Sequence, residues 1–181
     1  MVTESKIKNK GYSLVEMIVV LAIIGIVSAM SVVSITMIHS AKAKDAAVVF
    51  DAEVAELIAK SKGQSDSNSD IFAFKIYKDG ETYYLQHGTV VCSGAGSYTF
   101  TADSSDPISI SKYVRVSFYP EGEAYNNAWD AGYDLGTTGQ VLVFSKSGQC
   151  VSGAGNYGFF KRNGNLVART VVRKNGSHTS R

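Results

Sequence analysis

With 181 residues and a formal net charge of +2, the chain has room for one globular domain and one anchoring element, and its overall charge points to no class of partner. The two cysteines are far apart, and the three histidines have neither metal-ligand spacing nor the neighbours of a recognisable catalytic group. We therefore expect no cofactor, no metal ion and no enzymatic activity.

The first predicted element is a long apolar helix. Within residues 14–38 the only charged side chain is Glu16. At a rise of about 1.5 Å per residue, a helix of this length crosses a hydrocarbon core of about 30 Å. Lys6, Lys8 and Lys10 precede it and predict that the N-terminus stays in the cytoplasm, with the rest of the chain outside.

The helical pattern continues beyond the apolar segment. The apolar side chains there form one stripe at helical spacing, made of Ala47, Phe50, Val54, Leu57 and Ile58. Gly63 and a polar run then end the pattern. The sequence thus predicts one helix over residues 12–62, about 75 Å long by the helical rise. Its first half is apolar all round, and its second half has one apolar face.

Residues 10–16 read KGYSLVE, in which a basic leader ends at Gly11 and an acid, Glu16, follows five positions later. This pattern resembles the processing motif of type IV prepilins and type II secretion pseudopilins. The resemblance implies that a prepilin peptidase cleaves between Gly11 and Tyr12 and methylates the new amine of Tyr12. Tyr12 stands where phenylalanine is usual in the family, so the aromatic ring is kept.

The carboxylate of Glu16 needs an explanation, because a lone charge near hydrocarbon costs several kcal/mol. A charge pair removed from water is favourable only when both partners are present. The resemblance implies an assembly role, in which Glu16 of an incoming subunit pairs with the Tyr12 amine of a neighbour. The alternative is a pair within one chain, because Tyr12 and Glu16 are four residues apart on the predicted helix.

Past residue 70 the pattern changes to short runs rich in tyrosine, phenylalanine and valine, which are typical of strands. Asp79-Gly80 is predicted as the turn of the first hairpin. The candidate strands are residues 71–78, 81–87, 89–91, 97–101, 110–119, 140–146, 156–162 and 166–173. The predicted fold class is α+β: a long N-terminal α-helix, whose first half spans the membrane, packed on a C-terminal antiparallel β-sheet domain of the type IV pilin kind.

Four regions are expected from these patterns. Residues 1–11 form the cleaved leader, and residues 12–38 form the transmembrane and assembly half of the helix. Residues 39–62 form its amphipathic half, and residues 63–181 form the sheet-containing head domain.

For an exported domain, the sequence favours a disulfide between Cys92 and Cys150, although free thiols remain an alternative. Such a bond would contribute about 4 kcal/mol in the chain-entropy model. Each cysteine is followed by the letters SGAG, at residues 93–96 and 152–155. Neither copy leads into a helix or a Gly-Lys-Ser/Thr sequence, so both are predicted as turns before aromatic strands rather than phosphate loops.

The C-terminal residues 135–181 hold seven bases and no acid, whereas residues 51–134 hold thirteen acids and six bases. The order of strands and turns here resembles the end of H-type pseudopilins and related minor pilins. One interpretation is a solvated basic edge. The other is DNA binding, because some minor pilins of this group capture DNA for uptake. The candidate residues are Lys161, Arg162, Arg169, Arg173, Lys174 and Arg181.

The resemblance as a whole implies a structural subunit that resides in the cytoplasmic membrane before assembly. It would assemble with other pilin or pseudopilin subunits, through an inner-membrane assembly platform, into a cell-surface pilus or a periplasmic or cell-wall pseudopilus. The helix contains no proline, since the first proline is Pro107, which favours a minor pilin or pseudopilin over a major pilin. The sequence does not separate adhesion, motility, protein secretion and competence as the role of the system.

Overall fold

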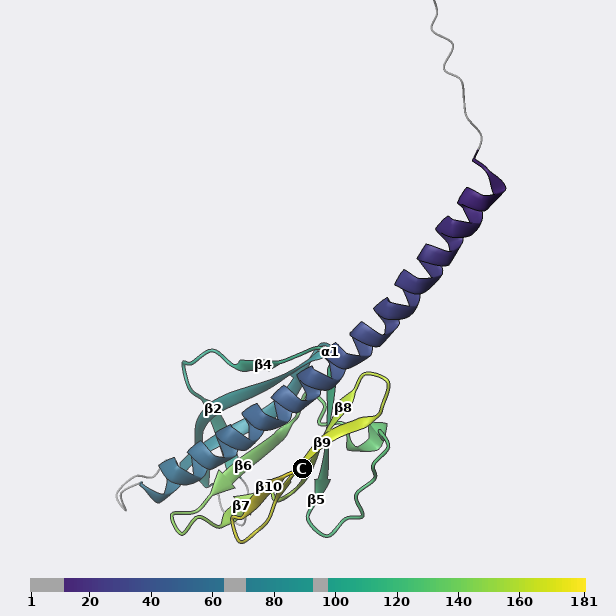
Figure 1. Ribbon diagram of the computed structural model, residues 1–181. Coiled ribbons are helices and arrows are strands. Elements are labelled where there is room, and N and C mark those ends of the chain that lie inside the picture. The colour runs from purple at the N-terminus through teal and green to yellow at the C-terminus, as the bar shows by residue number, and fades with distance from the viewer. Residues whose placement is uncertain (1–11, 64–70, 93–97) are drawn as a thin grey trace, which may run out of the picture. The chain divides into compact units, whose positions relative to one another are not determined.

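The computed structural model describes residues 12–63, 71–92 and 98–181. The helix α1 (Leu14–Lys62) comes first, and strands and a short 3-10 helix follow (Figure 1). The chain divides into two compact units, Met1–Ile38 and His39–Arg181. The strands of the second unit are β1 (Ile71–Asp79), β2 (Thr82–Cys92), β3 (Tyr98–Ala102), β4 (Ile108–Ile110), β5 (Val114–Pro120), β6 (Gln140–Phe144), β7 (Cys150–Ser152), β8 (Gly155–Lys161), β9 (Leu166–Val172) and β10 (His178–Ser180), and its 3-10 helix is η1 (Ala131–Tyr133).

The strands of the second unit form two antiparallel sheets. Sheet A has the order β3-β2-β1-β6-β7, with β4 also paired to β2, and sheet B has the order β10-β9-β8-β5. This arrangement of one long helix followed by antiparallel sheets confirms the predicted α+β class. The division of the strands between two sheets was not visible in the sequence.

The core of the second unit is built around one stripe of α1. Phe50 is fully buried, with its ring centroid 5.6 Å from Phe74 of sheet A and 4.5 Å from Tyr157 of sheet B. The second half of α1 therefore packs on both sheets at once (Figure 1). The buried helix residues are Ala43, Ala46, Ala47, Phe50, Val54 and Leu57, while the predicted Ile58 is only half-buried. Three small alanines in this stripe allow the helix backbone to approach the strands closely.

Two histidines connect the flanks of this stripe to the sheets. His87 Nε2 of β2 lies 2.8 Å from Glu53 Oε2, and His178 Nε2 of β10 lies 3.9 Å from Asp51 Oδ1. Glu53 thus faces sheet A and Asp51 faces sheet B. The third histidine, His39, stacks on the Tyr113 ring with a centroid distance of 4.7 Å. The sequence offered no partner for any of them, because each partner is more than thirty residues away along the chain.

The first hairpin turn lies one residue later than predicted. Asp79 pairs with Thr82, so the two-residue loop is Gly80-Glu81 rather than Asp79-Gly80. Gly80 has a φ of 59°, a conformation that glycine adopts without steric cost, and its position first in the loop sets the register. The predicted strands 81–87 and 89–91 are continuous in β2.

The predicted strand over residues 110–119 is divided into β4 and β5. A turn separates them, in which the Val114 amide donates to the Ser111 carbonyl at 2.9 Å. The SGAG copy at 152–155 forms the predicted turn before an aromatic strand, with Gly153 at a φ of 84°. The copy at 93–96 lies outside the described residues.

Gly88 in the middle of β2 is expected to tolerate no side chain. A Cβ there would overlap the Thr101 carbonyl oxygen and the Phe100 ring of β3. Replacing Gly88 with alanine should push β3 away and lower the free energy of unfolding by about 1–3 kcal/mol, the usual cost of overpacking. Thermal unfolding of the full chain in detergent would measure the loss.

Gly63→Ala is the matched control, since a Cβ there meets only carbonyl oxygens of Ala59 and Lys60, at 3.6 and 3.7 Å. Equal melting temperatures for the two variants would contradict the close approach at Gly88.

Candidate functional site

The first turn of α1 is capped by the side chain of Ser13, a residue that was not among the predicted site residues. The Glu16 amide donates to Ser13 Oγ at 3.2 Å, and the Met17 amide donates to the Ser13 carbonyl at 3.2 Å. Ser13 is therefore the N-cap, and Glu16 occupies the third helical position. The spacing Ser-x-x-Glu is the capping-box signature, and it would have predicted this helix start.

The first unit exposes a large apolar surface. Every described side chain over residues 12–37 is exposed, including Leu21 at 63% and Met30 at 66%. The most apolar eighteen-residue stretch has a mean hydropathy of 2.8 and is not buried within the protein. The helix is therefore long and apolar enough to cross a membrane. An exposed apolar surface of this size marks contact with lipid or with other proteins.

Two serine hydroxyl groups in this apolar segment are satisfied within the helix. Ser31 donates to the Val27 carbonyl at 2.9 Å, and Ser34 donates to the Met30 carbonyl at 3.1 Å. These bonds satisfy the hydroxyl donors, which avoids the free-energy cost of an unpaired polar group in hydrocarbon. The described segment can then meet lipid or another apolar helix with few unpaired donors.

Glu16 is the exception in this surface. Its side chain is exposed, and its carboxylate has no hydrogen-bond or ion-pair partner among the described residues. Tyr12 lies before the N-cap and outside the helix, so the helical spacing that would pair its amine with Glu16 in the same chain is not present. Gly11, on the other side of the predicted cleavage point, lies outside the described residues.

The N-terminal segment has a counterpart among known families. Residues 6–32 match the family model of the prokaryotic N-terminal methylation motif. The chain carries this methylation motif. The motif is the signature of type IV prepilins and pseudopilins, and the match includes Gly11, Tyr12, Glu16 and the first turns of α1. No curated protein and no solved structure matches the chain significantly.

The methylation motif implies processing by a prepilin peptidase and assembly with other pilin subunits. Together with the long apolar helix, it indicates membrane anchoring before assembly. It also indicates a structural subunit rather than an enzyme.

The six basic residues considered for DNA binding do not form one patch. Lys161 and Arg162 lie at the turn between β8 and β9, whereas Arg173 and Lys174 follow the opposite end of β9. β9 has seven residues, so at about 3.3 Å per residue these two pairs are separated by more than 20 Å. Arg181 lies beside the middle of β9, where it exchanges backbone hydrogen bonds with Arg169.

Two of the four arginines among these six residues already have partners within the domain. Arg169 donates to Asn156 Oδ1 at 2.7 and 3.1 Å and lies 4.3 Å from the centroid of the Tyr125 ring. Arg162 contacts Glu81 at 3.2 Å. The basic residues considered for DNA binding are therefore partly engaged in internal contacts.

The expected disulfide is not formed in the structure. Cys150 is a buried free thiol that donates to the Ser152 carbonyl at 3.1 Å. Cys92 ends β2, and β1 and β6 lie between β2 and β7 in sheet A. Three strand spacings of about 4.8 Å place the two backbones about 14 Å apart, beyond the reach of about 7 Å that a disulfide allows. The sequence could not show this separation.

Burial raises the pKa of the Cys150 thiol to about 12, so the group stays protonated and unreactive at pH 8. We expect iodoacetamide to label Cys150 about a thousandfold more slowly in the folded chain than in the unfolded chain. The unfolded chain is prepared with denaturant and without reductant. Mass spectrometry of the labelled peptides would measure both rates. The opposite outcome is that Cys150 of the denatured chain is labelled only after reductant is added. This result would show that Cys150 is part of a disulfide.

Proposed function

We propose that the chain is a pilin-like structural subunit, either a minor pilin or a pseudopilin, that prepilin peptidase cleaves between Gly11 and Tyr12. The supporting observation is the methylation motif together with a helical segment, which it overlaps and whose described side chains are all exposed over residues 12–37. Lipid would cover this surface before assembly, and the helices of neighbouring subunits would cover it afterwards.

Glu16 would determine how a subunit enters the filament. Cleavage creates a positive amine at Tyr12, close to the membrane layer that contains the Glu16 carboxylate. Because Tyr12 precedes the helix, the pairing of this amine with Glu16 of a neighbouring subunit is favoured over a pair within one chain. Each subunit added would then bring one acid and one amine together in an apolar environment, where either group alone is costly.

The three lysines of the leader support an orientation with residues 1–10 in the cytoplasm and the head domain outside. From this membrane pool the subunit would pass, through an inner-membrane assembly platform, into a pilus or a pseudopilus. The helix α1 is unbroken from Leu14 to Lys62 and contains no proline, which favours a minor pilin or pseudopilin. A major pilin is the alternative assignment.

The intact mass and N-terminal sequence of the protein from its native host would test this proposal. The expected mature chain starts at Tyr12 and is heavier than the unmodified residues 12–181 by one methyl group. A chain that still starts at Met1, in cells with an active prepilin peptidase, would contradict the proposal. A Gly11→Asp variant from the same cells is the control, and it should keep its leader.

DNA binding for uptake is a second proposal with less support. It rests on the absence of acids from residues 135–181, but Arg162 and Arg169 are engaged within the domain. Retention of DNA by the full chain at low salt, lost when Arg173 and Lys174 are replaced by glutamine, would favour it. No retention at low salt would remove it, because phosphate contacts are strongest there.

A further inference from the structure

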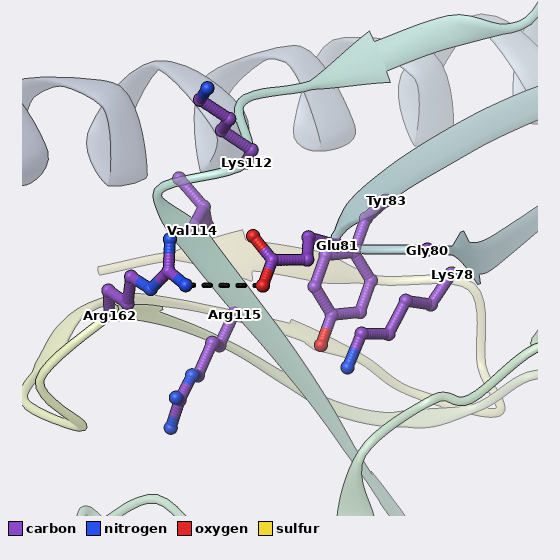
Figure 2. A pocket seen from close by; sticks show the side chains of 8 residues that line it. All are labelled: Lys78, Gly80, Glu81, Tyr83, Lys112, Val114, Arg115 and Arg162. Carbon is purple, nitrogen blue, oxygen red and sulfur yellow. Dashed lines mark hydrogen bonds and ion pairs between the residues drawn. The ribbon is translucent and has the colours of Figure 1, made fainter.

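A small basic pocket lies where the two sheets of the second unit meet (Figure 2). It is formed by the β1–β2 turn, the start of β5 and the β8–β9 turn, and its volume is about 110 Å³. Four cationic side chains and one carboxylate line it: Lys78, Lys112, Arg115, Arg162 and Glu81. None of its lining residues belongs to the methylation motif or to the apolar segment.

Two of the cations have internal counter-ions. Lys78 Nζ lies 2.8 Å from Asp134 Oδ2, and the other oxygen of Asp134 accepts a hydrogen bond from the Tyr83 hydroxyl. This lysine is therefore neutralised by a partly buried carboxylate that is already fully engaged. Arg162 Nη2 lies 3.2 Å from Glu81 Oε1, but these side chains are 49% and 69% exposed. An exposed ion pair of this kind contributes little stability and exchanges readily.

Arg115 is held in place without a carboxylate. Its guanidinium lies 5.3 Å from the centroid of the Trp129 ring, and it has no ion-pair partner among the described residues. A cation–π contact uses the face of the guanidinium and leaves the N–H donors at its edge available. Lys112 also lacks an acidic partner within the described chain, and its Nζ lies 5.4 Å from the Tyr113 ring centroid.

Glu81 lies at the centre of this arrangement. Figure 2 shows its carboxylate beside the Arg162 guanidinium, with the Arg115 head group below Arg162 on the same side, the Lys78 head group on the opposite side, and Lys112 pointing away. The charges of Lys78 and Arg162 are balanced by Asp134 and Glu81. The positive charges of Arg115 and Lys112 are not balanced by a carboxylate of the described residues. A region with two unbalanced cations attracts a doubly charged anion more strongly than a singly charged one.

We propose that this pocket binds a phosphate group, either as free phosphate or as a monoester, through Arg115 and Arg162. Guanidinium groups match phosphate oxygens with paired, charge-assisted hydrogen bonds. The incoming phosphate displaces Glu81 from Arg162, and the displaced side chain turns into solvent from its exposed turn. Glu81 therefore acts as an internal competitor that weakens binding.

Trp129 provides a direct probe, because it is the only tryptophan in the chain and lies against Arg115. The full chain in neutral detergent would be titrated with inorganic phosphate at constant ionic strength, with chloride as the balancing anion. We expect a saturable change in tryptophan fluorescence. Glu81→Gln should lower the Kd several-fold, whereas Arg162→Met should raise it about tenfold, the effect of losing a charged hydrogen bond.

Lys44→Met is the matched control, because it removes an exposed cation outside the pocket and should leave the Kd unchanged. Glycerol 3-phosphate distinguishes between a phosphate monoester and free phosphate as the natural ligand. Binding of glycerol 3-phosphate with a Kd similar to that of phosphate points to a monoester. Binding of inorganic phosphate alone points to the free ion. The proposal is overturned if the signal does not saturate, if acetate binds equally well, if Arg162→Met keeps its affinity, or if Glu81→Gln weakens binding.

Discussion

Replacing Glu16 with valine is expected to leave the protein in the membrane and to remove it from filaments. The substitution removes the only charge from residues 14–38, so membrane insertion is retained or improved. In an assembled filament the Tyr12 amine would then face apolar neighbours without its partner. The loss of one member of a buried ion pair costs about 3–5 kcal/mol, which corresponds to roughly a hundredfold to a thousandfold in association.

The measurement compares the membrane fraction with the sheared filament fraction by immunoblot. Glu56→Val is the matched control, because Glu56 is an exposed carboxylate of the same helix whose ion pair with Lys60, at 2.7 Å, lies on the surface. The control should be found in filaments at the normal level. Normal incorporation of the Glu16→Val variant would remove the pairing argument while leaving the processing of the leader untouched.

Replacing Phe50 with alanine is expected to give the largest loss of stability in the second unit. Phe50 is fully buried, and its ring contacts Phe74, Tyr157 and Phe159 at centroid distances of 5.6, 4.5 and 5.7 Å. Because these rings belong to both sheets, the cavity would weaken the whole contact between α1 and the strands. The free energy of unfolding should fall by about 3–5 kcal/mol, and the melting temperature by roughly 10 °C or more.

Thermal unfolding of the full chain in detergent, followed by the fluorescence of Trp129, would measure this effect. Val48→Ala is the control on the same helix, because Val48 is 66% exposed and its substitution should change stability by less than about 0.5 kcal/mol. Equal losses for the two variants would show that Phe50 does not hold the sheets together. Membrane insertion should be normal in both, because neither residue belongs to the first unit.

The N-terminal features could be predicted because their signals are local. A charge within an apolar run, a glycine before an aromatic residue and the helical spacing of Phe50, Val54 and Leu57 are all contained in short stretches. The structure agrees with the predicted helix to within two residues at its start. The Ser13 cap was also within reach, because the capping-box pattern is local.

The features that were missed depend on contacts between distant parts of the chain. The disulfide between Cys92 and Cys150 was expected only from the cysteine count of an exported domain, whereas the order of sheet A puts two strands between them. Likewise, His87 lies 2.8 Å from Glu53 only because β2 packs beside the second half of α1. The register of the first hairpin depends on whether Gly80 is the first or the second residue of the two-residue loop. In the structure it is the first, because Asp79 pairs with Thr82.

The sequence by itself determined that this protein has an N-terminal methylation motif and a long apolar helix followed by a domain rich in strands, because apolar periodicity and the motif are properties of the chain alone. Only the tertiary structure decided which charged side chains are engaged in internal contacts and which remain available to bind a partner. It engages Arg162 and Arg169 in internal contacts, separates the basic residues to opposite ends of β9, and brings Arg115 and Glu81 from different sheets into one pocket. The physical reason is that pairing between strands depends on the packing of the whole domain, whereas a helix and its caps depend on neighbours in the sequence.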